Sequence, residues 1–363
     1  MVSANERVLR IALALCPALE PSVARKLVRR LGSAQAVWSA DRADWRRVCK
    51  MREETAVRLD GWRHAFSDDL VEDHLAERGV HCLLPGDDDW PAALNDLDDA
   101  PHIVFLRGRR KSLGLAHHRV AVVGTRRASS YGLEATRWVT ETLVQGGCDV
   151  VSGLALGIDA EAHRAALDAG GTTGAVLACG VDVCYPSSHQ ALYEKICEQG
   201  WVVSEYPPGS LVEKYRFPER NRLIAALAQA VIVVQAGERS GALRTVEAAL
   251  DLGRDIYAVP GPITSVHFRG SHKLLQDGAR ILVDPLDVLT DWGLSCDAVD
   301  QRTVPARWRS MYDCLDGPVT ATHLEHQLQA SASEVFAGLL ELELAGFIER
   351  VPGGLYQRCR HGH

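Results

Sequence analysis

The sequence predicts an α/β fold in which a doubly wound parallel sheet forms the largest domain, with smaller modules on either side. Two observations support this class. Short Val/Ile/Leu runs alternate with helical segments through residues 119–292, whereas the flanking regions are mainly helical in pattern. The chain has 363 residues, of which 47% are hydrophobic, so it is long and apolar enough for several domains with their own cores.

The central segment, residues 119–292, predicts the sheet itself. Its apolar runs are "RVAVVG", "CDVVSG", "TTGAVLACG", "GWVVSEY", "AVIVVQA", "DIYAVPG" and "ARILV". Continuous apolar strands separated by helices are typical of a parallel sheet that is buried on both faces. We therefore expect an extended Rossmann-like domain, whose ligands bind beyond the carboxyl ends of its strands.

The flanking segments predict three further parts. Residues 1–80 contain apolar residues at helical spacing in "ERVLRIALAL", "PSVARKLVRRLG" and "RADWRRVC", which indicates a small all-α domain. Residues 81–118 are rich in Pro and Asp and are expected to form an acidic connector with one short strand at its end. Residues 300–358 follow the order of a winged helix, with two helices, a strand, a Pro-Gly-Gly turn and a second strand.

The net charge of −7 is unevenly distributed along the chain. Residues 1–66 carry 13 basic and 7 acidic groups, whereas residues 67–100 carry 1 and 11. Residues 101–296 are balanced with 20 of each, and residues 297–363 carry 6 and 9. Only local patches are therefore expected to attract a polyanion.

One basic patch lies in the first segment. Arg25, Lys26, Arg29 and Arg30 recur at the spacing of one helix face. Two interpretations remain open, a phosphate-facing surface and an ordinary solvated helix face.

The ten cysteines include no C-x-x-C pair, so neither a zinc site nor a disulfide framework is predicted, and we expect reduced thiols. No metal is implied. The first apolar run is short and is broken by Pro17. It predicts neither a signal peptide nor a membrane span, and we expect a cytoplasmic protein.

The turn within "VAVVGTRRASSYG", residues 120–132, is the first candidate for ligand binding. Gly124 allows close approach to the backbone, the free N–H groups of the next helix favour an anion, and Arg126 or Arg127 adds a guanidinium. The chain contains neither G-x-G-x-x-G nor the P-loop pattern, which disfavours NAD and P-loop nucleotides. A phosphate site without a cofactor is therefore predicted.

Two further strand ends carry similar turns. "SGLALGIDAEAH" places Ser152, Gly153 and Gly157 before a helix, and "GERSGALRTVEAAL" places Ser240 and Gly241 at another helix start. Exposed backbone amides at such positions favour anions. Asp159 and His163 follow the first of these turns, and it stays open whether they take part in a site or only cap and cover the helix.

Basic and aromatic residues alternate in "EKYRFPERNR", residues 213–222. Lys214, Arg216, Arg220 and Arg222 flank Tyr215 and Phe217. This pattern suits single-stranded nucleic acid, because cations take the phosphates and rings stack on bases. The alternative is that one of the rings fills the core as a loop plug. Neither G-x-S-x-G nor H-E-x-x-H occurs, and no catalytic residue is predicted.

Together these motifs resemble the DNA-processing protein DprA family, also called Smf, through most of residues 119–290. The matching segments are "VAVVGTRRASSYG", "VVSGLALGIDAEAHRAAL", "AVLACGVDVCYPSSHQALYEKI", "SEYPPG", "FPERNRLIAALAQAVIVVQAGERSGALRTVEAALDLGRDIYAVPG" and "RGSHKLLQDGARIL". The resemblance implies a cytoplasmic, non-enzymatic protein that binds single-stranded DNA during natural transformation. It also implies a homodimer formed through the Rossmann-like domain, which protects the strand and loads the RecA recombinase onto it.

The resemblance also implies roles for individual residues. Arg126 and Lys214 would hold phosphates, Phe217 would stack on a base, and Arg220, Asn221 and Arg222 would share one pocket wall. The complete predicted single-stranded DNA site is Gly124, Thr125, Arg126, Ser152, Gly153, Gly157, Lys214, Phe217, Arg220, Asn221, Arg222, Ser240 and Gly241.

The chain departs from the family pattern at several positions. Thr125 stands where the family usually has Ser, Leu156 where it often has Arg, and His272 where it often has Asn. Because Leu156 removes one cation from the predicted pocket, weaker DNA affinity is expected. The N-terminal domain, residues 1–80, resembles a SAM or helix-hairpin-helix module. Ala18 and Glu20 stand where a helix-hairpin-helix turn has glycines, which argues against backbone phosphate binding there. The winged-helix segment is acidic, so we expect it to dock protein or regulate rather than bind DNA.

An enzymatic alternative comes from the same superfamily. Nucleotide phosphoribohydrolases cut the base from a nucleoside monophosphate and carry a Gly-Gly-x-Gly-Thr-x-x-Glu loop beside the phosphate site. The comparable loop here, residues 239–247, has a single glycine, and Thr245 and Glu247 are separated by one residue instead of two. This spacing disfavours the enzyme.

Overall fold

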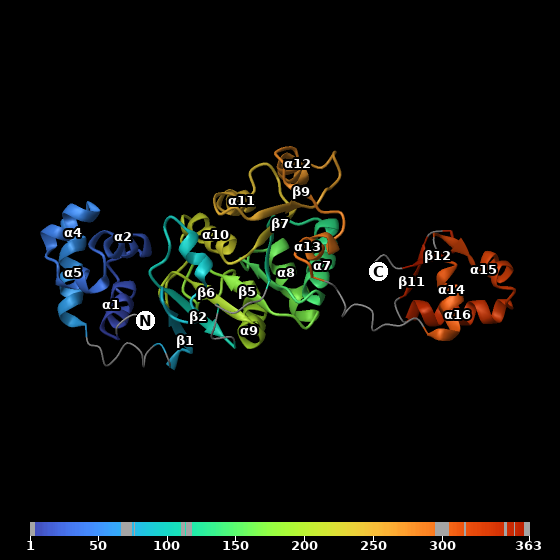
Figure 1. The fold of residues 1–363 in the computed structure, drawn as a ribbon, viewed down its shortest axis with the longest axis horizontal. Coiled ribbons are helices and arrows are strands. Elements are labelled where there is room, and N and C mark those ends of the chain that lie inside the picture. Colours follow the sequence, from blue (N-terminus) through green and yellow to red (C-terminus); the bar gives the residue numbers. More distant parts are fainter. Residues whose placement is uncertain are drawn as a thin grey trace. The chain divides into compact units, whose positions relative to one another are not determined.

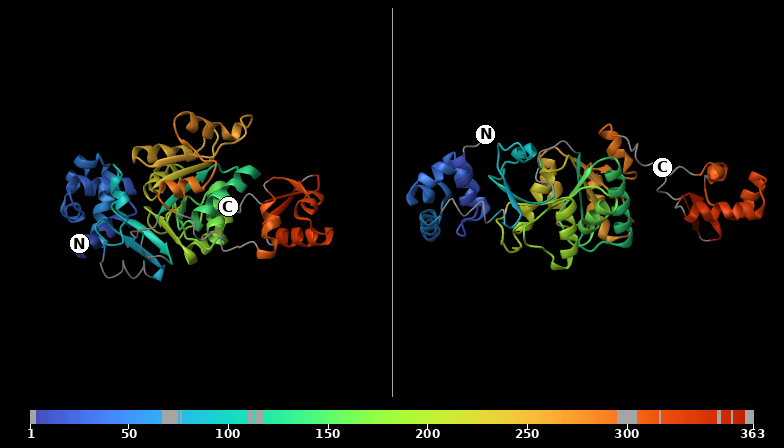
Figure 2. Two further views of the ribbon diagram at one scale, coloured as in Figure 1. Left: turned by 45° about the vertical axis from the view of Figure 1, so that its right-hand side comes forward. Right: turned by 90° about the horizontal axis from the view of Figure 1, so that it is seen from below.

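The computed structural model describes residues 4–66, 75, 77–109, 113, 118–294, 305–315, 317–344, 347–351 and 353–358. The chain divides into two compact units, residues 1–293 and 294–363. Figures 1 and 2 show the elements of both units as ribbons.

A nine-stranded sheet forms the centre of the first unit, in the order β1-β2-β6-β5-β4-β3-β7-β8-β9. The strands from β6 to β9 are parallel, which confirms the predicted doubly wound parallel sheet. Strand order reverses between β3 and β7, and a ligand site is expected at such a switch point. The parallel strands are β3 (Arg119–Gly124), β4 (Asp149–Ser152), β5 (Thr173–Val176), β6 (Trp201–Ser204), β7 (Ala230–Gln235), β8 (Asp255–Ala258) and β9 (Arg280–Ile281).

The segment expected to be a connector with one strand contributes two strands to the sheet. β1 (Val80–Leu83) pairs with β2 (Val104–Gly108), and β2 pairs with β6, both antiparallel. Ile103, Val104 and Phe105 are fully buried, so the end of this segment is part of the core. The pairing covers the edge that β6 would otherwise expose.

Helices cover both faces of the sheet, and side chains alternate between the two cores along each strand. On β6, Trp201 and Val203 join one core, whereas Val202 joins the other. The helices are α7 (Ser130–Gln145), α8 (Ile158–Asp168), α9 (Gln190–Gln199), α10 (Arg216–Ala226), α11 (Ala242–Asp251), α12 (Arg269–Gln276) and α13 (Leu286–Asp291), with short 3-10 turns η2 (Ala92–Asp96), η3 (Ser187–His189) and η4 (Val266–Phe268).

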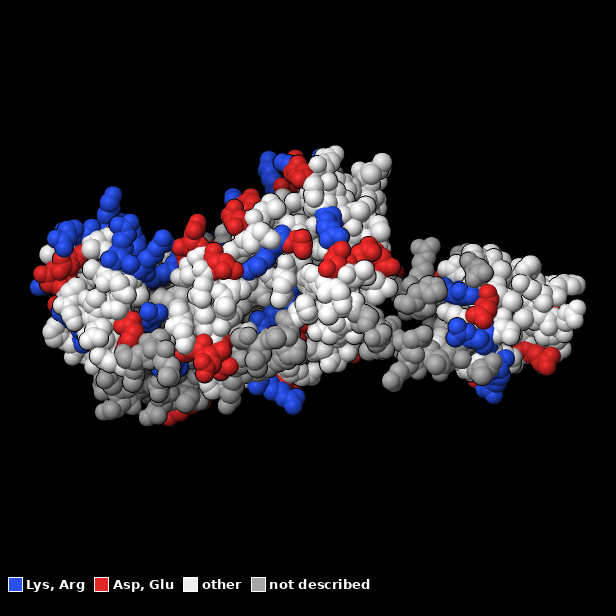
Figure 3. All heavy atoms as spheres, viewed as in Figure 1, with Lys and Arg blue, Asp and Glu red and all other residues white. Residues whose placement is uncertain are grey.

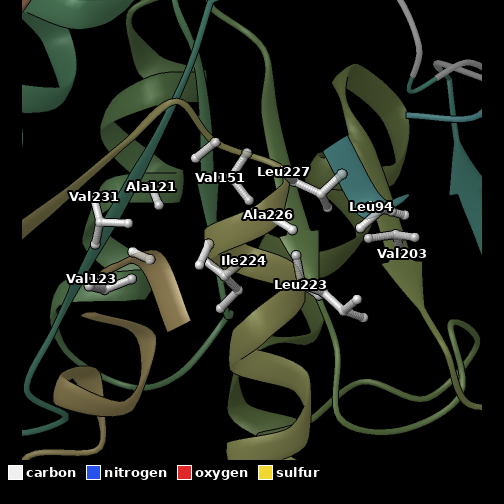
Figure 4. Packing of buried hydrophobic residues seen from close by; sticks show 14 of the residues in the cluster. Leu94, Ala121, Val123, Val151, Val203, Leu223, Ile224, Ala226, Leu227 and Val231 are labelled. Atoms are coloured by element: carbon white, nitrogen blue, oxygen red, sulfur yellow. The ribbon is translucent and has the colours of Figure 1, made fainter. Parts of the chain in front are cut away.

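The core beneath α10 and α11 fixes the position of the elements that will form the site. Leu223 and Ile224 of α10, and Leu227 directly after it, pack in one cluster with Val151 and Val203 of the sheet (Figure 4). Because these side chains are at most 5% exposed, the start of α10 is held rigidly above the carboxyl ends of the strands.

Within residues 4–66, five helices form a small core around the fully buried Trp45. Ile11 and Ala14 of the first helix also join the core of the sheet, so this helical region packs against it. The helices are α1 (Ala4–Ala14), α2 (Pro21–Leu31), α3 (Ala34–Ser39), α4 (Arg42–Cys49) and α5 (Glu53–Ala65). Gly32 ends α2 in the left-handed conformation that favours glycine, with φ +94°.

The second unit has the predicted winged-helix order, with a core around Leu324, Val335 and Leu339. Its three strands pair in the order β10-β12-β11. The elements are η6 (Ala306–Trp308), α14 (Arg309–Asp313), β10 (Val319–Thr320), α15 (Ala321–Leu328), α16 (Ala332–Leu344), β11 (Ile348–Val351) and β12 (Leu355–Arg358). In the described parts of both units, every helix is too short or too polar to cross a membrane.

Candidate nucleic-acid interface

A cavity of about 480 Å³ lies at the carboxyl end of β3, beside the point where the strand order reverses. Its walls come from the loop after β3 and from the first turns of α8, α10 and α11. Eight residues of the predicted site line it, namely Gly124, Thr125, Arg126, Phe217, Arg220, Asn221, Ser240 and Gly241. The turns that the sequence predicts at separate strand ends therefore lie together at one cavity.

The loop after β3 is fixed at both ends and presents Arg126 to solvent. The Thr125 backbone N–H donates to the Gln235 carbonyl at 2.7 Å, and the Ser129 backbone N–H donates to Gln235 Oε1 at 3.0 Å. The Ser129 hydroxyl then caps α7 by accepting from Gly132 N–H at 3.1 Å. Arg126 lies between these anchors and is exposed.

Gly157 brings the start of α8 against this loop. Its φ is +79°, and a Cβ there would lie 2.3 Å from the Thr125 carbonyl oxygen. Only glycine combines that backbone conformation with that approach. Gly157 is not among the residues that line the cavity, so it shapes the loop behind the site.

Arg126 and Phe217 come together from distant parts of the sequence. The guanidinium carbon of Arg126 lies 5.0 Å from the centroid of the Phe217 ring, which is a cation–π distance. Tyr185 approaches the same ring at 5.8 Å between centroids. Tyr185 was not predicted as a site residue, because no Lys or Arg accompanies it in the surrounding residues 180–190. A cation and a half-buried aromatic ring therefore stand side by side at the cavity.

Arg220 lies at the cavity wall but is only 4% exposed. One of its terminal nitrogens donates to the carbonyl oxygens of Gly153, at 2.8 Å, and Val176. Burial lowers the pKa of Arg220 to about 10, against the opposing charge of Asp159, so the guanidinium stays cationic at neutral pH. Its main contacts are thus internal, and it holds the ends of β4 and β5 to α10.

Asp159 is buried beside Arg220. Its carboxylate accepts from the Gly153 N–H at 3.1 Å. Burial raises the pKa of Asp159, while the positive charge of Arg220 works in the opposite direction. Since Asp159 also lines the cavity, it can contact a ligand in addition to supporting the helix start.

His163 has a purely internal position. It is fully buried, and Nδ1 lies 2.6 Å from the Thr173 hydroxyl. Burial lowers the pKa of His163 to about 3, so the ring is neutral. Of the two interpretations left open by the sequence, the structure supports the second for His163, in which the residue covers the helix and takes no part in a site.

Ser152 and Gly153 are buried behind the cavity and do not line it. The Ser152 hydroxyl donates to the Val122 carbonyl at 2.7 Å. At Gly153 a Cβ would lie 2.6 Å from the Arg220 guanidinium, so glycine makes room for that side chain. Both residues support the site from below.

The placement of Arg222 in the wall with Arg220 and Asn221 requires correction. Arg222 pairs with Glu205 and, at 3.1 Å, with Asp99, and it is not among the lining residues. The reason is helical geometry, because residues two apart on a helix point to opposite sides. Lys214 is exposed and also lies outside the cavity lining.

The first turn of α11 closes the site. Asn221 Nδ2 donates to the Gly241 carbonyl at 3.2 Å, which ties α10 to this turn. Thr245 and Arg244 line the cavity from α11 and were not selected from the sequence, which gave no strand-end signal for residues inside a helix. Among the described residues, no cluster of three metal-ligating side chains and no disulfide occurs.

This sheet and its site define a Rossmann-like protein with a cation and an aromatic ring at the switch point. Residues 81–293 match the family described as DNA recombination-mediator protein A, and residues 316–354 match the DprA winged helix domain. The chain belongs to the DNA recombination-mediator protein A family, whose members process DNA in recombination.

Sequence relatives cover most of the chain. It is 36% identical over 345 residues to a putative DNA processing protein DprA of Mycobacterium tuberculosis, covering 89% of this chain and 87% of that protein. It is 37% identical over 312 residues to protein Smf of Escherichia coli, covering 82% and 83%. The resemblance inferred from the motifs is thereby confirmed.

Solved structures of this family are also similar. The crystal structure of DprA from Streptococcus pneumoniae has a TM-score of 0.66 at 32% identity, covering 80% of this chain and 99% of that one. DNA processing protein A of Helicobacter pylori, described with its single-stranded DNA binding mode, has a TM-score of 0.54 at 28% identity, covering 59% and 95%.

Proposed function

We propose that this chain is a non-enzymatic, cytoplasmic protein that binds single-stranded DNA, protects it during natural transformation and loads the RecA recombinase onto it. The observation that carries the proposal is the pairing of Arg126 with Phe217. The Arg126 guanidinium carbon lies 5.0 Å from the centroid of the Phe217 ring, and both residues line the cavity at the end of β3. A phosphate and an adjacent unpaired base require this combination of cation and ring. The Helicobacter pylori relative, described as binding single-stranded DNA, supports the same ligand.

Each group of residues has a distinct role in this proposal. Arg126 and Lys214 hold phosphates, and the backbone amides around Gly124, Thr125, Ser240 and Gly241 favour the anion. A base stacks on Phe217. Asn221 and the buried Arg220 keep α10 and α11 in place, while Ser152, Gly153 and Gly157 shape the floor.

Homodimerisation through the Rossmann-like domain is part of the proposal. Large apolar side chains are exposed on η4, β9 and the loops beside them, including Ile263, which is 90% exposed. The others are Val266, Ile281 and Val283. Exposed apolar residues in this number support an interface between copies. Two pockets acting on one strand would raise affinity through effective concentration.

The phosphoribohydrolase alternative has less support. In that enzyme class, Thr and Glu belong to one loop at the phosphate site. Here Thr245 lines the cavity, but Glu247 does not, and its carboxylate pairs with Arg244 at 2.8 Å. We therefore propose binding without catalysis. Release of free base from nucleoside monophosphates by the purified protein would contradict this.

The purified protein should bind oligothymidylate far more tightly than a duplex of equal length, because a duplex hides the base faces that stack on Phe217. Fluorescence anisotropy over a range of salt concentrations measures both affinities, and binding should weaken as salt rises. Equal affinity for the two ligands would exclude stacking as the basis of recognition.

Arg126→Ala should weaken the binding of single-stranded oligonucleotides whatever their sequence, and should reduce the salt slope of log K by about 0.7, the value for one lost phosphate contact on a single strand. Arg137→Ala is the matched control, since Arg137 is an exposed arginine on α7 that pairs with Glu161. The role of Arg126 would be withdrawn if both variants bound like the parent.

A further inference from the structure

A second cationic surface lies on the helical region, at the end of α2 beside the end of α4. Figure 3 shows Lys and Arg side chains gathered over these two helices. Residues 1–66 have a net charge of +6, in contrast to the chain as a whole. The sequence left open whether the basic face of α2 binds phosphate or is only solvated. In the structure its four cations fall into two pairs, Arg25 with Arg29 and Lys26 with Arg30, which differ in their contacts.

The first pair fastens α2 to the sheet. Arg25 pairs with the buried Glu205 and, at 2.9 Å, with Asp99. Arg29 donates to the Asp98 carbonyl at 2.8 Å. Both side chains therefore have partners within the fold, Arg25 in two carboxylates and Arg29, which is exposed, in one backbone carbonyl.

The second pair, Lys26 and Arg30, is one helical turn apart and exposed. Among the described residues, neither has a carboxylate within ion-pair distance. Both charges act on the same thiol of Cys49 at the end of α4, where they oppose the increase in pKa that burial causes. Lys26 and Arg30 thus form one unneutralised cluster between α2 and α4.

The cluster is connected to the cavity through the start of α10. Glu20, which precedes α2, pairs with Arg216 at 3.1 Å, and Arg216 is the residue before Phe217. Tyr215 is 50% exposed, and its ring lies 5.7 Å from the Arg216 guanidinium carbon. From Glu20, Lys26 and Arg30 lie about 9 Å and about 15 Å along the axis of α2.

We propose that Lys26 and Arg30 bind the phosphate backbone of the same single strand whose base stacks on Phe217. The strand would leave the cavity across Lys214 and Tyr215 and continue along α2. This inference rests on the proposed function and adds a second contact region on the helical domain. The ligand is a phosphodiester backbone, and the site is electrostatic and independent of sequence.

If Lys26 and Arg30 had only a structural role, a different result would be expected. A cation in the last turn of a helix interacts favourably with its dipole, so Arg30, with Lys26 one turn before it, could stabilise α2 without either side chain contacting DNA. Their replacement would then lower the melting temperature of the protein without changing DNA affinity.

The test compares the full-length double variant Lys26→Gln/Arg30→Gln with the parent by fluorescence anisotropy. Glutamine keeps helix propensity while it removes both charges. The matched control is Lys195→Gln/Arg164→Gln, which removes two exposed charges from α9 and α8. The probes are oligothymidylates of about 6 and about 24 nucleotides, chosen to cover the cavity alone and the longer track, with a duplex of the longer length.

The double variant should bind the short probe like the parent and the long probe about tenfold more weakly, with the salt slope reduced by about 1.4. The control should match the parent on both probes. Parent-like binding of the long probe, with or without a change in melting temperature, overturns the inference. A loss confined to the duplex also overturns it, because the ligand would not be the stacked strand. A parent that binds neither oligothymidylate contradicts the proposed function itself.

Discussion

Arg220→Met should lower the free energy of unfolding by about 3–5 kcal/mol, because the substitution leaves buried polar groups without partners. The guanidinium donates to the Gly153 and Val176 carbonyls. It also provides the positive charge that opposes the desolvation of Asp159. Methionine fills a similar volume, so the loss reports the missing charge and donors more than a cavity. Urea unfolding followed by tryptophan fluorescence and circular dichroism measures it.

Arg222→Met is the matched control on the same helix. Its partner Glu205 keeps a second ion pair with Arg25, so no carboxylate loses its only cation. We expect a clearly smaller loss than for Arg220→Met. If the two variants were equally unstable, the special position of Arg220 beneath the site would be refuted.

The instability of Arg220→Met should depend on pH in a defined direction. Burial raises the pKa of Asp159 in the folded protein, and the loss of Arg220 removes the main effect that opposes this. A raised carboxyl pKa means that the folded state disfavours the charged form, so the penalty is present at high pH. It disappears as pH falls through the folded pKa and the carboxyl takes up a proton. The gap between variant and parent should therefore narrow from pH 8 to pH 5.

Asp159→Asn in the Arg220→Met background tests the same cause by removing the charge. The double variant should regain part of the lost stability, and its difference from the parent should vary less with pH. A gap that stays constant with pH in the single variant would show that Asp159 does not contribute.

The sheet could be predicted from the sequence because its strands are continuous apolar runs, and burial on both faces is what such runs require. The two antiparallel strands, β1 and β2, were harder to predict. β1 has only four residues, and β2 pairs antiparallel with β6, a strand almost a hundred residues later. Charged residues and prolines surround both strands, so the sequence of residues 81–118 is equally typical of a loop.

The candidate site could be predicted in outline but not in its contacts. Gly124 ends β3 and Gly241 lies in the loop after β7, and the carboxyl ends of parallel strands share one edge of the sheet, so the topology brings the two glycines together. The pairing of Arg126 with Phe217 depends on how α10 packs against the sheet and α11, and the local sequence does not determine that packing. Helix phase likewise turns Arg222 away from the cavity, although it is only two residues from Arg220.

Phe217→Ala should weaken oligothymidylate binding by about 10- to 100-fold, since stacking on one ring contributes about 1–3 kcal/mol per base. The salt slope of binding should change little, because no phosphate contact is lost. This is the opposite signature to that of Arg126→Ala, although the two side chains are in contact. Anisotropy titrations at several salt concentrations give both quantities.

Two further substitutions at Phe217 separate stacking from packing, the alternative in which the ring is a plug for the core. Phe217→Trp keeps a stacking face and should bind nearly as well as the parent, whereas Phe217→Leu keeps apolar bulk and should bind like Phe217→Ala. The position of the ring makes this a fair test, since it is half-buried and contacts Tyr185 and Arg126 at the cavity. Parent-like binding by Phe217→Leu would mean that the side chain only fills space beside Tyr185, and a base would then have no ring to stack on there.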